Sequence, residues 1–182
     1  MKKIATAALL LLSLTTYAQK TVPLKDNLPY YERAFPVSGS RSDAYNDTKL
    51  FFAEYFKRST PNVVTDDKDG GRYAVRTCLF YHCFANPEDF KGRLLSLMSI
   101  TFRSDSCFVQ LYDWQLQRAD QKTKWAMLPN GALMPEGVPV WADQNEGSLV
   151  KEAAKGRRVA TAELSAVDKE VAKLLDAYQK RL

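Results

Sequence analysis

The segment Val63–Val75, VVTDDKDGGRYAV, is the part of this 182-residue chain that most resembles a site. Its acidic residues adjoin two glycines, as in loops that bind calcium or cradle a phosphate. If Gly70 is placed at the glycine of an EF-hand loop, Thr65 falls on the first ligand position and Arg76 replaces the bidentate glutamate. The Gly-rich loop also lacks the following Lys and Ser or Thr of a phosphate-binding loop. The pattern therefore predicts a hairpin turn, because Asp and Gly tolerate the left-handed backbone that such turns need.

His82, the only histidine, lies between Cys78 and Cys83, which raises the question of a zinc site. Side chains alternate between the two faces of a strand, so these three residues do not share one face, and we expect a packed, hydrogen-bonded histidine. Cys78 and Cys83 are about 16 Å apart along a strand, whereas a disulfide needs Cα atoms within about 7 Å. Cys107 begins a strand two strands away. The sequence thus predicts three unpaired thiols.

The remaining chemistry-bearing side chains are dispersed. Carboxylates and serines are plentiful, but no motif surrounds any of them. The sequence therefore indicates no catalytic residue, no cofactor and no metal site. An envelope hydrolase that uses carboxylates or a Ser–Lys pair stays open as an alternative, because folding can bring distant residues together.

The first residues have the pattern of a secretory signal peptide over residues 1–18. Lys2 and Lys3 precede the short apolar run Ile4–Leu14, and Thr16-Tyr17-Ala18 supplies small residues before a cut at Gln19. We therefore expect an exported protein, periplasmic or secreted.

A formal charge of +5 does not indicate a nucleic-acid partner, and no later stretch predicts a membrane span. The partner we expect is another envelope protein or a peptide.

The elements that would position these residues are mostly strands. Alternating and β-branched patterns predict strands over 30–37, 62–66, 72–84, 93–103 and 107–116, with a turn over 85–92. A helix begins at Ser40 or Ser42 and ends before Pro61, and its apolar side consists of Ala44, Thr48, Phe51, Phe52 and Tyr55. Consecutive strands with short links predict an antiparallel meander.

The C-terminal third has a different character. Residues 119–161 are predicted to be an irregular Pro/Gly-rich segment packed on the core, with a small hairpin at Asn130-Gly131. Ser165 is expected to cap a final helix within 162–182, whose buried stripe is Val167, Val171, Leu174, Leu175 and Tyr178. Residues 19–29 are an N-terminal extension, and 30–118 form the core of the domain.

This order of elements resembles a large family of exported bacterial domains of unknown function with a TBP-like fold. The matching segments are the helix KLFFAEYFK, the turn DDKDGGRYAV, and the strands LLSLMSITF and CFVQLYDWQL. The resemblance implies an α+β fold, a curved antiparallel sheet in the order strand, helix, four-strand meander, helix, with the helices packed on one face. It implies no activity.

Apolar side chains on both faces of the predicted sheet point to a binding surface. In the last strand Phe108, Tyr112 and Trp114 are expected on one face and Cys107 and Val109 on the other. With Met98 from the neighbouring strand, Phe108, Tyr112 and Trp114 are the residues of a candidate apolar binding surface. We expect the segment Trp125–Trp141 to cover it; a partner protein, a peptide or an apolar ligand is the alternative. The function predicted is a non-catalytic binding or structural module of the envelope, with a carrier of an apolar small molecule as a further alternative.

Overall fold

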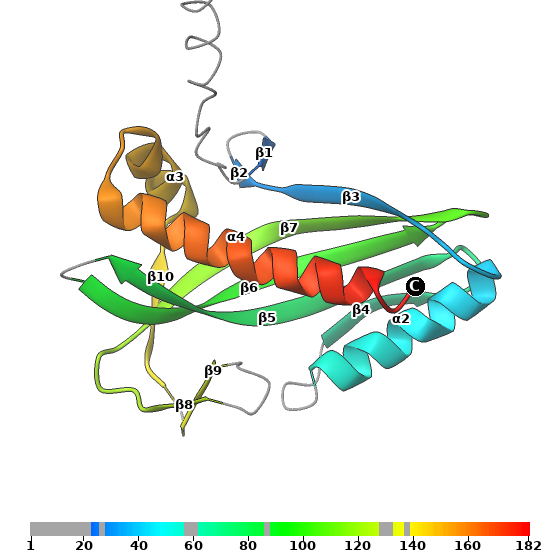
Figure 1. The fold of residues 1–182 in the computed structure, drawn as a ribbon, viewed down its shortest axis with the longest axis horizontal. Coiled ribbons are helices and arrows are strands. Elements are labelled where there is room, and N and C mark those ends of the chain that lie inside the picture. Colours follow the sequence, from blue (N-terminus) through cyan, green and yellow to red (C-terminus); the bar gives the residue numbers. More distant parts are fainter. Residues whose placement is uncertain (1–22, 26–27, 57–61, 86–87, 128–132, 137–138) are drawn as a thin grey trace, which may run out of the picture.

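The computed structural model of the chain describes residues 23–25, 28–56, 62–85, 88–127, 133–136 and 139–182. Its main feature is one curved, open antiparallel sheet (Figure 1), in the order β10-β7-β6-β5-β4, with β3 also paired to β7. Its strands are β3 (Tyr31–Pro36), β4 (Asn62–Asp67), β5 (Arg72–Ala85), β6 (Glu88–Phe102), β7 (Ser106–Ala119) and β10 (Trp141–Gln144). Two small pairs accompany it: β1 (Leu24–Lys25) with β2 (Leu28–Pro29), and β8 (Trp125–Met127) with β9 (Leu133–Pro135).

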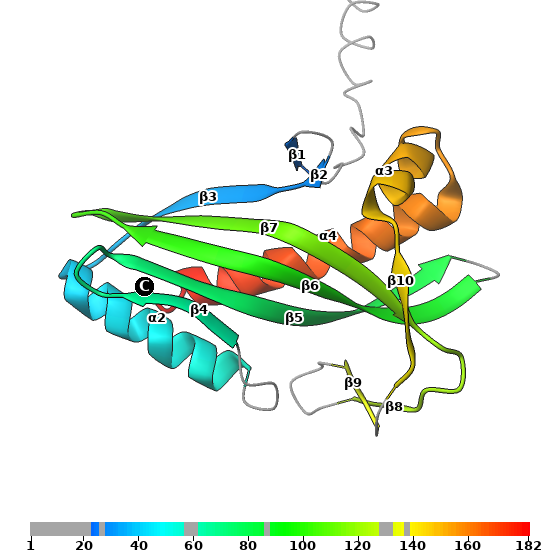
Figure 2. The same cartoon turned by 180° about the vertical axis from the view of Figure 1, so that it is seen from behind.

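The long helices lie on one face of this sheet. They are α2 (Arg41–Tyr55) and α4 (Arg158–Gln179), and α3 (Glu146–Ala154) packs beside the start of α4. In Figure 1 α4 lies in front of β5, β6 and β7, and in Figure 2, seen from behind, the same strands lie in front of α4. We call the side under α2 and α4 the helix face and the other side the open face.

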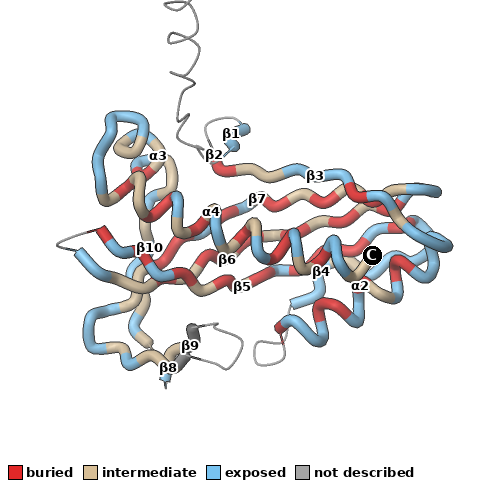
Figure 3. Tube along the Cα trace, in the orientation of Figure 1, coloured by how far each residue is buried: buried red, intermediate tan, exposed pale blue. Residues whose placement is uncertain are grey.

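The core lies between α4 and the helix face. The stripe predicted for the last helix is confirmed, because Val171 and Leu174 are 0% exposed and the rest of the stripe is also buried. Along β6 the residues from Gly92 to Phe102 alternate strictly between buried and partly exposed, the pattern of a strand with one covered face (Figure 3). Burial of each such large apolar side chain contributes about 1.5–3 kcal/mol, so the stripe is the main attachment of α4.

Helix α2 fits the sequence prediction closely. Ser40 caps it, and its hydroxyl accepts a hydrogen bond from the backbone N–H of Asp43. Phe52 is fully buried, and Thr48 Oγ1 lies 2.7 Å from the Tyr178 hydroxyl of α4. This buried contact ties the two helices together. Tyr55, predicted on the apolar side, is 41% exposed at the end of the helix.

The acidic segment within Val63–Val75 is a hairpin turn between β4 and β5, as predicted. Gly71 has a φ of +66°, and its N–H donates to the carbonyl of Lys68. The Asp67 carboxylate accepts from the Gly70 N–H at 2.8 Å. The acidic side chain at this position therefore stabilises the turn.

Three sequence predictions about the elements are wrong. β6 begins at Glu88, because its long ladder with β5 extends to the Ala85↔Glu88 pair and overrides the turn signal of residues 85–92. Helix α4 begins at Arg158, about two turns before the expected cap at Ser165. The segment 119–161 is not irregular throughout, since it contains β8, β9, β10 and α3. The proposed signal peptide, residues 1–18, and the hairpin turn at Asn130-Gly131 lie outside the described residues.

A bulge in β7 also corrects the predicted assignment of faces. The β6–β7 register shifts between Leu95 and Leu97, so that two residues of β7 oppose one of β6. Asp113 lies in this bulge with a φ of 54°, the only positive value at a described non-glycine residue. The extra residue reverses the alternation, so that Trp114 joins the helix face, where its ring stacks on Tyr31 at 5.4 Å.

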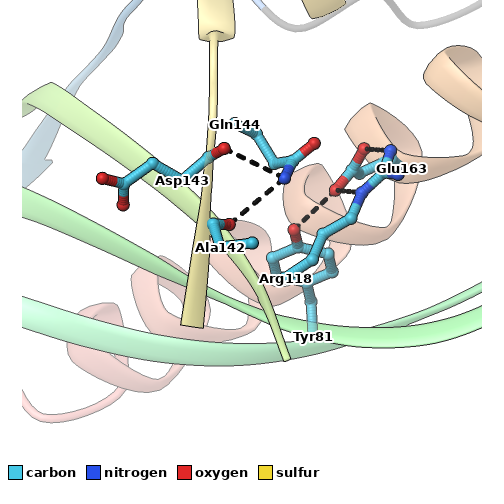
Figure 4. A network of polar contacts seen from close by, with 6 residues as sticks. All are labelled: Tyr81, Arg118, Ala142, Asp143, Gln144 and Glu163. Carbon is cyan, nitrogen blue, oxygen red and sulfur yellow. Dashed lines mark hydrogen bonds and ion pairs between the residues drawn. The ribbon is translucent and has the colours of Figure 1, made fainter. Parts of the chain in front are cut away.

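A buried carboxylate, Glu163, joins α4 to strands β5 and β7 of the sheet (Figure 4). The Glu163 side chain is 0% exposed and accepts hydrogen bonds from the Tyr81 hydroxyl at 2.6 Å and from Arg118 at 3.1 and 2.5 Å. Burial and the Glu163 charge raise the pKa of Tyr81, which keeps its hydroxyl protonated as a donor. Gly92 makes room for this network, since a Cβ there would lie 2.4 Å from the Tyr81 ring.

The three cysteines are unpaired, as predicted. Cys83 lies opposite Phe90 at one end of β5, whereas Cys107 lies opposite Phe102 at the other end of β6. Cys83 and Cys107 are fully buried and Cys78 is partly exposed. Burial and the nearby Glu163 raise the pKa of the Cys83 thiol to about 11.

The first prediction concerns the backbone of the bulge. We expect Asp113→Val to destabilise the fold by about 1–3 kcal/mol relative to Asp113→Asn, since a β-branched residue is strained at positive φ whereas Asn tolerates it. Both variants remove the exposed ion pair with Arg76, so their difference isolates the backbone effect. Urea unfolding measures it, and equal midpoints would contradict the bulge geometry.

The second prediction concerns the buried carboxylate. Glu163→Ala leaves Arg118 and the Tyr81 hydroxyl without their acceptor, so we expect a loss of about 3–5 kcal/mol in the free energy of unfolding. Glu170→Ala on the same helix removes only the exposed pair with Lys173 and should change stability by less than about 1 kcal/mol. Denaturant unfolding of both variants decides it, and similar small losses would show that the network is weakly formed.

The third prediction concerns the thiols. The unreduced protein should yield three titratable thiols in denaturant, and in the native state near pH 8 only Cys78 should react quickly, because burial protects the other two. The stability linked to the Cys83 proton is complete below its unfolded pKa of about 8.5 and is lost as the pH rises towards 11. A single titratable thiol in denaturant would indicate a disulfide and contradict the strand register.

Candidate functional site

The helices leave the open face of the sheet uncovered (Figure 2). The register places Leu97 opposite Arg76 of β5 and Tyr112 of β7, and Leu95 opposite Cys78. Partly exposed apolar side chains thus continue across three strands. They are Cys78, Phe80, Leu95, Leu97, Phe108 and Tyr112, which we call the apolar stripe.

The structure splits the four residues of the predicted binding surface between the two faces. Phe108 and Tyr112 lie on the open face, in the apolar stripe. Met98 is 0% exposed and Trp114 is 9% exposed, and both belong to the core under α4. The expectation that all four share one surface is therefore wrong. The bulge explains Trp114, and Met98 lies opposite Leu111 and Val75 on the helix face.

Part of the predicted cover is present at one end of the apolar stripe. Trp125 of β8 and Trp141 of β10 pack on Phe80, with ring centroids 5.9 and 6.2 Å away. The Arg93 guanidinium lies 4.3 Å from the Trp141 ring and its Nε donates to Gln117. The two ends of the segment, Trp125 and Trp141, thus fold back as expected, but they leave Leu95, Leu97 and Tyr112 partly exposed.

Cationic side chains surround the apolar stripe. Arg76 and Arg93 flank it on the open face, and Arg103 lies 4.3 Å from the ring of Phe108. With Arg72 and Lys91 these residues form a basic rim. Asp113 partly neutralises it through its 3.0 Å ion pair with Arg76. An apolar centre with a polar, charged rim is the usual anatomy of a surface that binds another protein.

Two acidic residues near the open face, Asp89 and Asp143, have polar side-chain partners. His82 Nε2 lies 2.5 Å from Asp89 Oδ1 and its side chain is 40% exposed, so the predicted hydrogen bond is present but the histidine is not packed. The Asp143 carboxylate accepts from Gln115 and Gln117.

Within the described residues no three His, Cys, Asp or Glu side chains gather where they could hold a metal ion. No helix in that part of the chain has the length and apolar character needed to cross a membrane.

A shallow groove adjoins the Glu163 network on the helix side. Its cavity has a volume of about 470 Å³ and lies between β10, α3 and the start of α4. Gln144 and Arg118 line it, together with Arg157 and Arg158. Arg118 is held by Glu163, and Arg157 lies 3.3 Å from Glu152. The first pair joins β7 to α4, and the second joins α3 to the start of α4.

Four of the six residues of the apolar stripe were not predicted as part of a binding surface: Cys78, Phe80, Leu95 and Leu97. Phe80 and Cys78 lie two residues apart in β5, and Leu95 and Leu97 lie two apart in β6, so the alternation of each strand contains the signal. What sequence could not supply is the register that aligns these pairs with Tyr112 across the bulge.

Comparison with solved structures identifies the fold of this chain. No protein-family model matches the chain, and no curated protein matches it. Among solved structures it is similar to a DUF4468 family protein from Bacteroides ovatus, with 13% identity, a TM-score of 0.50, and coverage of 84% of this chain and 89% of that one. It is also similar to a TBP-like protein from Parabacteroides distasonis, with 16% identity, a TM-score of 0.52, and coverage of 87% and 97%. The chain therefore has the TBP-like α+β fold that occurs in a family of domains of unknown function, which confirms the fold that the sequence resemblance implied.

Proposed function

We propose that this protein is an exported, non-catalytic binding module of the cell envelope and that it binds a partner protein through the open face. The observation that carries the proposal is the apolar stripe, which continues across β5, β6 and β7 and stays partly exposed beyond the two tryptophans. Exposed apolar surface is unfavourable in water and is retained on proteins mainly where something docks. Export rests on the signal-peptide pattern of residues 1–18.

The side chains of the open face indicate which class of partner protein would bind there. The basic rim favours acidic groups, and the apolar stripe favours aliphatic or aromatic side chains. The stripe is shallow and crosses strands, so it suits a protein segment laid over the sheet better than an enclosed small molecule. We therefore expect a segment with apolar residues at its centre and acidic residues beside them, bound more weakly as salt screens the rim.

Leu97→Asp tests the proposal. Leu97 lies in the middle of the apolar stripe between Arg76 and Tyr112, so a carboxylate there should reduce both the binding of a hydrophobic dye and the capture of a partner from native envelope extract. Loss of a central apolar contact typically weakens binding by about 10-fold or more. Mass spectrometry of the captured proteins identifies the partner.

The matched control is Leu50→Asp, the same change at a side chain that is 51% exposed on α2. It should leave dye binding and capture unchanged, while thermal unfolding confirms that both variants fold. Equal capture by the original protein and Leu97→Asp would show that the open face is not the binding surface. Raised salt should release the partner from the original protein, and salt-insensitive capture would contradict the role of the basic rim.

A further inference from the structure

A cleft interrupts the edge of the sheet beside the bulge of β7. The outer edge of β7 pairs with β3 as far as Leu111 and with β10 from Leu116 onwards. In the described part of the chain, residues 112–115 have no partner strand on that edge. A cavity of about 470 Å³, within the range of small-ligand sites, lies at this interval. Its lining residues are Lys25, Pro29, Tyr30, Gln110, Tyr112, Asp113, Trp114 and Glu146.

The walls of this edge cleft combine aromatic rings with polar groups of both kinds. Tyr30, Tyr112 and Trp114 supply rings. Lys25 supplies N–H donors, and the Glu146 carboxylate supplies acceptors. Glu146 is fixed in place, since its Oε1 accepts the backbone N–H of Leu116 at 2.7 Å.

Two features of the residues that line the edge cleft are unfavourable for the stability of the folded protein. Asp113 holds a left-handed backbone conformation that side chains rarely adopt. The Nε1 of Trp114 is buried, with no hydrogen-bond partner in the described residues. An unsatisfied buried donor destabilises a fold by about 1–3 kcal/mol. A ligand oxygen that reached the indole N–H would offset this cost.

The balance of charge decides the class of ligand. Asp113 and Glu146 line the edge cleft and disfavour an anion. Asp113 is already paired with Arg76, so the charges that remain for a ligand are one carboxylate, Glu146, and one ammonium, Lys25. The Lys25 ammonium lies 4.8 Å from the centre of the Tyr30 ring, where it disfavours a second cation. A neutral ring whose hydroxyl groups both donate and accept matches carboxylates and N–H groups alike, and its apolar C–H surface packs on aromatic faces. We propose that the edge cleft binds a neutral carbohydrate ring.

Calorimetric titration of the purified protein tests this with neutral, anionic and cationic probes. The neutral probes are chitotriose, cellotriose and maltotriose; the others are trigalacturonate and choline. We expect at least one neutral trisaccharide to bind with a Kd of about 1 mM or tighter, and the two charged probes to bind at least about 10-fold more weakly. Absence of binding by all three neutral probes, or preference for a charged probe, would overturn the proposal.

Three variants assign any binding to the edge cleft. Trp114→Phe keeps an aromatic ring but removes the Nε1 donor, and Glu146→Gln keeps an acceptor for the Leu116 N–H but removes the charge. Each should weaken trisaccharide binding by about 5-fold or more, as expected for one lost hydrogen bond. Trp141→Phe makes the same ring change in the aromatic cluster on Phe80 and should leave binding unchanged. An equal loss in Trp141→Phe, or none in the two cleft variants, would place the carbohydrate elsewhere and contradict the assignment.

Discussion

The position of α4 on the sheet depends on one buried carboxylate. The buried apolar side chains of α4 could pack on the helix face in more than one register, because hydrophobic contacts are not directional. Glu163 removes this freedom, since a fully buried charge is tolerated only where Tyr81 and Arg118 both reach it. Those two donors come from strands on either side of β6, and Gly92 between them leaves room for the Tyr81 ring. A directional contact at one end of α4 thus fixes the alignment of the whole helix over three strands.

The bulge in β7 is the second constraint, and it determines what each surface presents. Without the extra residue at Asp113, Trp114 and Leu116 would continue on the open face with Tyr112. With it, both join the core, and β7 offers Tyr112 and Phe108 to the apolar stripe. The same irregularity separates the pairing of β7 with β3 from its pairing with β10, which opens the edge cleft. One inserted residue therefore shapes both candidate sites.

The elements were predictable from local patterns, and the sites were not. Alternation and helical spacing identified α2, the strands of the meander and the stripe of α4, because these signals follow the two periods of regular structure. The start of α4 was missed because Arg157 provides no side-chain cap, so its first turns carry no local signal. The placement of Trp114 was wrong because a bulge at Asp113 leaves no mark in sequence that distinguishes it from an ordinary strand residue. The Glu163 network was invisible because its members lie far apart in sequence, at Tyr81, Arg118 and Glu163.

The similarity to other TBP-like structures establishes only the fold of this chain. At 13% and 16% identity a shared backbone arrangement gives no information about a shared site. Function in this chain must therefore come from what its own residues add to the shared sheet. The helices α2 and α4 lie over the helix face, so we place binding on the open face and at the sheet edge. The two surfaces differ in kind: the apolar stripe is broad, shallow and rimmed with cations, whereas the edge cleft is small and lined by carboxylates and rings. A broad shallow face suits a protein and a small polar cleft suits a compact ligand, and the two adjoin each other at Tyr112, which belongs to both.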